Sequence, residues 1–126
     1  LSSRAVFLTQ LRRILGRPVP AEDLEDMWAL LLLRDGRLRL PQSIFYIAER
    51  RRFWQRWIGA LTRLDLPTLI LWGDQDPVAV PAIAKQLQAE IPGARLQWLP
   101  DLGHYPQLED PDVVATAILQ FLSERR

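Results

Sequence analysis

Cysteine is absent from this 126-residue chain, so neither a disulfide framework nor a thiolate metal site can form. Histidine occurs once, and together with scattered carboxylates it gives no close spacing of metal ligands, so we expect no metal. The longest apolar run, residues 29–33, is far shorter than the roughly 20 residues that a membrane span requires. No basic and apolar signal segment follows Leu1. We therefore expect a soluble protein, located in the cytoplasm.

An excess of charge of one sign is also lacking. The formal net charge is +1, and apolar and charged residues make up 48% and 25% of the chain, which is typical of one soluble globular domain. The arginines Arg50, Arg51 and Arg52 are flanked by apolar and aromatic residues, which favours a solvated helix face over a nucleic-acid-binding stripe. We expect no nucleic-acid partner.

The first half of the chain, residues 1–64, lacks a convincing strand and predicts four helical stretches. The first runs from a cap at Ser2 or Ser3 to Gly16 and Pro18, and the second from Pro20 to residues 35–36. The third lies around residues 44–47, after a short link over residues 37–41, and the fourth covers residues 53–64. Apolar side chains at helical spacing support these stretches: Val6, Phe7, Leu11, Ile14 and Leu15, then Leu24, Met27, Trp28 and Leu31, then Ile44, Tyr46 and Ile47, then Trp54, Trp57, Ile58 and Leu61.

Beyond residue 65 the pattern changes to strand, helix, strand, helix. Residues 69–72 form a continuous apolar run, as in a strand covered on both faces, and residues 96–99 predict a second strand. Pro81 begins the helix between them, and Asp110 caps a last helix that has Pro111 in its first turn. This order predicts two parallel strands joined by a right-handed crossover.

An acid and the only histidine follow the two predicted strands. Asp76 comes after the first strand and His104 after the second, so both fall at the carboxyl edge of the sheet. Neighbouring strands lie roughly 4.8 Å apart, which lets a carboxylate orient an imidazole whose other nitrogen activates a nucleophile or water. Asp74 and Asp101 fit the acid role on the same grounds. A surface histidine and a turn aspartate would give the same pattern.

The residues around this pair are similar to a known family. Residues 69–78 (LILWGDQDPV) and 103–111 (GHYPQLEDP) resemble the C-terminal third of the α/β-hydrolase fold. In that superfamily the G-x-x-D-P segment supplies the acid of a catalytic triad and the G-H segment supplies its base. The resemblance therefore assigns these roles to Asp76 and His104, and it implies that no cofactor is used.

A narrower resemblance covers most of the chain. Residues 25–28 (EDMW), 35–36 (DG), 51–61 (RRFWQRWIGAL) and 104–111 are similar to the mesoderm-specific-transcript hydrolases, which carry a helical cap over the active site. The resemblance implies a partial α/β-hydrolase, with a cap over residues 1–62 and the last two strand–helix units of the core over residues 63–126. It also implies a small-molecule substrate, for which we expect binding residues in the cap, with simple helix packing as the alternative: Trp28, Tyr46, Trp54 and Trp57.

The family's nucleophile has no counterpart here. The serines are Ser2, Ser3, Ser43 and Ser123, and none sits in the G-x-S-x-G elbow that such enzymes use. Because the chain begins at Leu1, not at methionine, we expect a missing N-terminal half that supplies a serine or aspartate nucleophile and the oxyanion hole. The chain would then contribute acid and histidine to hydrolysis of an ester-like or other activated bond. The alternative is a non-catalytic interaction module that reuses the half-fold.

Overall fold

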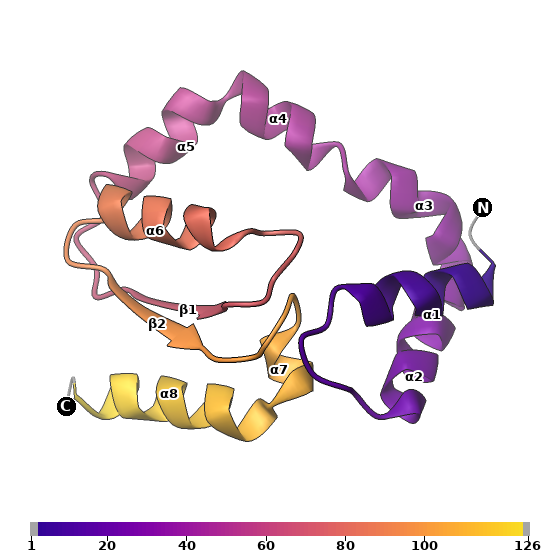
Figure 1. Cartoon of the computed structure of the whole chain (residues 1–126). Helices are drawn as coiled ribbons and strands as arrows, with labels where there is room; N and C mark the ends of the chain where they lie inside the picture. The colour runs from indigo at the N-terminus through magenta and orange to yellow at the C-terminus, as the bar shows by residue number, and fades with distance from the viewer. Residues whose placement is uncertain (1–2, 125–126) are drawn as a thin grey trace.

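The structure, a computed structural model, describes residues 3–124, apart from the side chain of residue 37. Its first half is helical and its second half alternates strands and helices (Figure 1). In chain order the elements are α1 (Arg4–Arg13), α2 (Ala21–Leu32), the 3₁₀ turn η1 (Leu33–Asp35), α3 (Gly36–Ser43), α4 (Tyr46–Arg52), α5 (Trp54–Leu61), β1 (Leu69–Gly73), α6 (Pro81–Glu90), β2 (Arg95–Leu99), α7 (Pro106–Glu109) and α8 (Pro111–Ser123). Within this described part, no helix is long and apolar enough to cross a bilayer.

The two strands pair in parallel, as the sequence predicts, with Ile70 opposite Leu96 and Trp72 opposite Trp98. Helix α6 makes the crossover and packs on one face of the strands, while α8 lies along the other side (Figure 1). Ile70, Ala84 and Ile91 form the core beneath α6 because the apolar strand residues face the apolar stripe of that helix. This parallel arrangement brings the loops after β1 and β2 to the same edge of the sheet.

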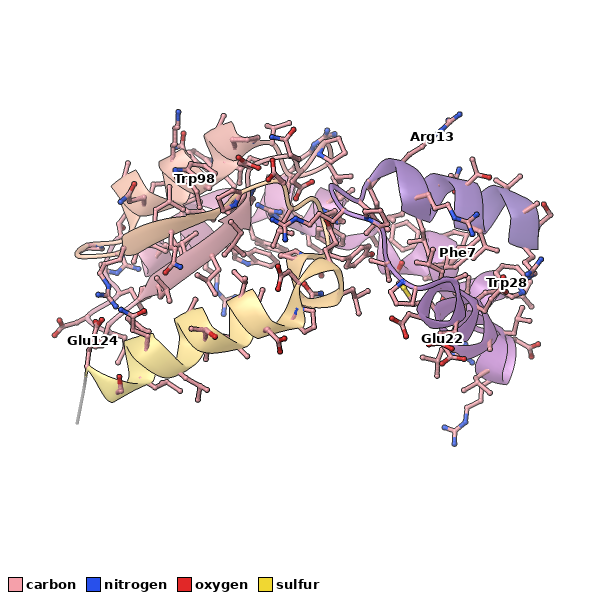
Figure 2. The ribbon with its side chains drawn as sticks, turned by 60° about the horizontal axis from the view of Figure 1, so that its bottom comes forward. Phe7, Arg13, Glu22, Trp28, Trp98 and Glu124 are labelled. Atoms are coloured by element: carbon pink, nitrogen blue, oxygen red, sulfur yellow. The ribbon has the colours of Figure 1, made fainter. Side chains whose placement is uncertain are left out.

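A second core lies between α1 and α2. Leu8, Leu11 and Leu24 are buried there, and the ring of Phe7 packs on Trp28 with centroids 5.3 Å apart (Figure 2). The expected inward position of Val6 is wrong: its side chain is 46% exposed, and Leu8 is buried instead. A helix advances about 100° per residue, so Leu8 shares a face with Leu11, whereas Val6 lies about 140° around the helix from Leu11.

The ends of these two helices are fixed by polar contacts. The Ser3 hydroxyl accepts a hydrogen bond from the Val6 amide and caps α1, whereas Ser2 lies outside the described residues. The Arg4 Nε donates to the Glu25 carboxylate at 2.7 Å, which joins α1 to α2. This hydrogen bond, and then the charge of Glu25, raise the pKa of Arg4 above its ordinary value.

Helices α3, α4 and α5 form an arch from α2 to the start of β1 (Figure 1). The expected link over residues 37–41 is wrong, because α3 spans Gly36–Ser43 and contains Pro41 in its last half. The predicted helix over residues 53–64 ends earlier, at Leu61. Many large apolar side chains of this arch are exposed: Leu38, Leu40, Ile44, Phe45, Tyr46, Ile47, Phe53, Trp54 and Trp57. The arch therefore has an apolar surface that the described residues do not cover.

Candidate active site

Asp76 and His104 are in direct contact at the carboxyl edge of the sheet. The His104 Nδ1 lies 2.9 Å from Oδ2 of Asp76 and 3.1 Å from Oδ1. Asp76 is 7% exposed, whereas the side chain of His104 is 29% exposed. With its hydrogen on Nδ1, the imidazole donates to a carboxylate that is shielded from water. The contact expected from the strand order is therefore present.

The carboxylate of Asp76 is itself held in place by the loop that follows it. The amides of Val78 and Ala79 donate to its Oδ1 at 2.8 and 2.9 Å. The carbonyl of Ala79 in turn accepts a hydrogen bond from the indole nitrogen of Trp72 on β1, at 2.8 Å. A buried carboxylate that accepts several hydrogen bonds has a fixed orientation, so Asp76 can orient the ring of His104.

Hydrogen bonds from backbone amides join the loops after β1 and β2. The Asp101 amide donates to the carboxylate of Asp74 at 2.9 Å, and the Gln75 amide donates to the Leu102 carbonyl at the same distance. Gly73 permits this approach, because a Cβ atom there would lie 2.3 Å from the Leu102 oxygen.

These contacts decide between the three candidate acids. Asp74 uses Oδ1 to accept from the Asp101 backbone, and the side chain of Asp101 is 77% exposed, 3.8 Å from Arg17. Within residues 3–124, Asp76 is the carboxylate whose hydrogen bonds include the ring of His104.

One ring nitrogen of His104, Nε2, is available to exchange a proton. The ring packs edge-on to Tyr105, with centroids 5.0 Å apart, and its Nδ1 is taken by Asp76. Across the described part of the chain, Nε2 has no hydrogen-bond partner. An imidazole held in this way can accept a proton at Nε2 while Asp76 stabilises the resulting imidazolium.

Glu109 is a site residue that the sequence analysis did not single out. Its carboxylate accepts hydrogen bonds from the backbone amides of Gly16, Arg17, Gly103 and Tyr105, at 2.8 to 3.1 Å. The sequence signal for Glu109 is its place within residues 103–111, the segment that carries the family resemblance. Spacing alone does not assign a role to a glutamate on a short helix.

The predicted substrate-binding residues fall into two places. Tyr46, Trp54 and Trp57 line an open hollow of about 770 Å³ between α4, α5 and α6, with Arg50 and Leu87 also on its wall. Trp28 lies elsewhere, packed on Phe7 between α1 and α2 (Figure 2). The residues that line this hollow do not include Asp76 or His104, so the structure does not join the hollow to the acid–histidine pair.

A metal site has little support in the described side chains. No group of three or more His, Cys, Asp or Glu residues in this part of the chain is placed to hold an ion. The polar groups around His104 are mostly backbone amides that donate to carboxylates, an arrangement that orients side chains.

Comparison with known proteins identifies the family. The sequence profile described as "Alpha/beta hydrolase family" matches residues 2–117. The chain belongs to this family. The chain is 38% identical over 125 residues to LipZ of Mycobacterium tuberculosis, a candidate hydrolase, covering 97% of this chain and 43% of LipZ. It is 34% identical over 123 residues to the mesoderm-specific transcript protein of Mus musculus, covering 94% and 36% of the two chains.

A solved structure agrees with this assignment. The crystal structure of a candidate lipase, lip1, from Acinetobacter baumannii superposes with a TM-score of 0.78 and 26% identity, covering 98% of this chain and 42% of lip1. The partial α/β-hydrolase fold expected from the sequence is thereby confirmed. The chain spans about two fifths of the length of these relatives.

Proposed function

We propose that this chain supplies the acid and the general base of a nucleophile–histidine–aspartate triad, in an enzyme that hydrolyses an ester or another activated bond of a small molecule. The observation that carries the proposal is the 2.9 Å contact between Nδ1 of His104 and the buried carboxylate of Asp76. If the nucleophile is a hydroxyl, Nε2 of His104 takes its proton as that oxygen attacks the substrate. If the nucleophile is a carboxylate, it attacks first, and Nε2 takes the proton of the water that then hydrolyses the covalent intermediate.

The nucleophile of this proposal lies outside the 126 residues. The Ser43 hydroxyl donates to the Leu40 carbonyl within α3, and Ser123 donates to Gln120 within α8. The Ser3 hydroxyl caps α1. These hydroxyls are used in their own helices, and none of them contacts His104. Because relatives are more than twice as long, a preceding part of the fold is the natural source of the nucleophile and the oxyanion hole.

The same proposal assigns residues 1–62 to a cap and residues 63–126 to the end of the core. The exposed apolar arch α3–α5 supports this division, since contiguous apolar surface marks a place that another surface covers. The N-terminal half of the fold would cover it. Tyr46, Trp54 and Trp57 would then form a wall of the substrate pocket, with Trp28 holding α2 on α1.

Kinetics on the protein extended upstream of Leu1 test this function. We expect the extended protein to hydrolyse a p-nitrophenyl ester, and Asp76→Asn to lower kcat by about 10³- to 10⁴-fold because the ring loses its orienting carboxylate. The matched control is Asp101→Asn, an exposed carboxylate on the loop of His104, which should change kcat by less than about 2-fold.

Two results would contradict the proposal. One is equal turnover by the extended protein and its Asp76→Asn variant. The other is turnover by the 126-residue chain alone, since no serine hydroxyl among residues 3–124 contacts His104. An extended protein without an elbow and without activity would favour the interaction module.

A further inference from the structure

The carboxylate of Glu109 binds the backbone on both sides of His104. The amide of Gly103 donates to its Oε2 at 2.8 Å, and the amide of Tyr105 donates to Oε1 at 3.1 Å. These two residues flank His104 in the chain. The Tyr105 amide belongs to the peptide group that follows His104, and the Gly103 amide to the peptide group before Gly103, so Glu109 restrains the backbone on either side of His104 and limits where the imidazole can point.

The same carboxylate binds a distant segment, the connector between α1 and α2. The amides of Gly16 and Arg17 donate to Oε2 at 2.8 and 2.9 Å, although they lie more than 90 residues away in sequence. The His104 amide also donates to the Ile14 carbonyl at 2.8 Å, so this connector contacts the histidine loop directly.

The two segments touch so closely that only glycine fits at the contact. A Cβ atom on Gly103 would lie 2.4 Å from the Gly16 nitrogen, and one on Gly16 would lie 2.3 Å from the Asp101 oxygen. Arg17 strengthens the junction through an ion pair with Asp110 at 2.7 Å.

An anionic group is suited to this junction because all its partners are donors. A carboxylate has two acceptor oxygens and no donor; Oε2 accepts from the amides of Gly16, Arg17 and Gly103, and Oε1 accepts from the fourth amide. A glutamine would turn its NH₂ group toward some of those amides and lose their hydrogen bonds. Hydrogen bonds to a charged acceptor are also roughly twice as strong as neutral ones.

We propose that Glu109 is a positioning residue, which fixes the backbone on both sides of His104 to the α1–α2 connector and so holds the imidazole against Asp76. This inference rests on the proposed function, because it gives Glu109 a role only through His104. The Glu109 contacts also couple the first two helices to the histidine, because a displacement of the α1–α2 connector would move the carboxylate that holds the loop of His104.

The imidazole of His104 gives a direct test, since it is the only histidine in the 126-residue chain. Nitrogen-detected NMR of the neutral ring reports which nitrogen carries the hydrogen. We expect the Nδ1–H form in the unaltered chain, a mixture with the Nε2–H form in Glu109→Gln and Glu109→Ala, and a similar mixture in Asp76→Asn. The matched control is Glu124→Gln, which removes a carboxylate paired with Arg95 at the far end of α8 and should leave the ring unchanged.

A second readout separates positioning from folding. In the extended protein we expect Glu109→Gln to lower kcat by about 10- to 10²-fold while KM changes by less than about 3-fold, because misplaced groups slow chemistry more than they weaken binding. If both variants fail to fold, hydrogen exchange on the unaltered chain replaces them: the amides of Gly16, Arg17, Gly103 and Tyr105 should be protected.

Three outcomes would overturn the inference: folded Glu109 variants with the ring spectrum of the unaltered chain, a Glu109→Gln variant that changes KM alone, or unprotected amides at those four positions. A ring spectrum that also stays unchanged in Asp76→Asn would contradict the proposed function itself, which distinguishes the two failures.

Discussion

At the scale of single residues, burial follows position on a helix more closely than residue type. Leu24 and Leu30 both lie on α2, yet the first is 2% exposed and the second 65% exposed. Leu24 packs against Leu8 and Leu11 on α1, while Leu30 points away from that core.

This difference predicts unequal costs for the same substitution. Leu24→Ala should lower the free energy of unfolding by about 2–5 kcal/mol, because it leaves a cavity between α1 and α2. Leu30→Ala, the control on the same helix, should lower it by less than about 0.5 kcal/mol. Urea denaturation followed by circular dichroism measures both. Equal midpoints for the two variants would show that α1 and α2 do not pack as described.

The candidate site was predictable from the sequence down to the acid–histidine pair, but not to the contacts that hold it. Spacing placed Asp74, Asp76 and Asp101 at one edge, and choosing among them needs backbone hydrogen bonds that spacing does not encode. Glu109 was missed for the same reason: its partners are main-chain amides, which every residue possesses. The family resemblance separated Asp76 from the other two acids where periodicity could not.

At the scale of elements, the junction between the two site loops depends on a residue without a side chain. A Cβ atom on Gly73 would lie 2.3 Å from the Leu102 oxygen and 2.4 Å from the Gly103 oxygen, both of them backbone atoms that cannot rotate away. By contrast, a Cβ atom on Gly59 in α5 would approach only the Arg63 side chain, at 3.6 Å.

We expect opposite effects of the two alanine substitutions. Gly73→Ala should lower the free energy of unfolding by about 1–3 kcal/mol, because the loops must move apart. Gly59→Ala should raise it by about 0.5–1 kcal/mol, since alanine loses less backbone entropy in a helix. Thermal melts of the variants test this. A Gly73→Ala melting temperature at or above that of the unaltered chain would contradict the close approach.

The elements that the sequence predicted are those with a strong pattern. The parallel strands, α6 and α8 follow from continuous or periodic apolar residues. The two helices also have clear start signals, at Pro81 for α6 and at Asp110 for α8. Helix α3 was missed because Gly36 and Pro41 normally interrupt helices, and its apolar side chains are exposed, so burial imposes no period on them. Helix α7 has four residues, too few to display any period.

At the scale of the whole molecule, the arch α3–α5 leaves apolar side chains on the surface of the 126-residue chain. Phe45 is 66% exposed there. Contiguous apolar surface associates in water.

We therefore expect the chain alone to self-associate, with an apparent mass that rises with concentration above 14.6 kDa. Phe45→Ser should weaken this association, and Phe45→Leu, which keeps an apolar side chain at the same position, should not. Size-exclusion chromatography with light scattering over a range of concentrations measures it. A monomer at every concentration, with one sharp thermal transition, would instead support a self-sufficient interaction module.

The long-range contacts of Glu109 also fix the order in which the site can be assembled. A ribosome makes Gly16 93 residues before the carboxylate that binds it, and Asp76 28 residues before the imidazole that faces it. The connector is therefore made long before its partner, and Asp76 a shorter time before His104. We expect nascent chains released before residue 109 to hold formed helices but no aligned pair, so that α7 is the last part of the site to be made and the one that fixes the others.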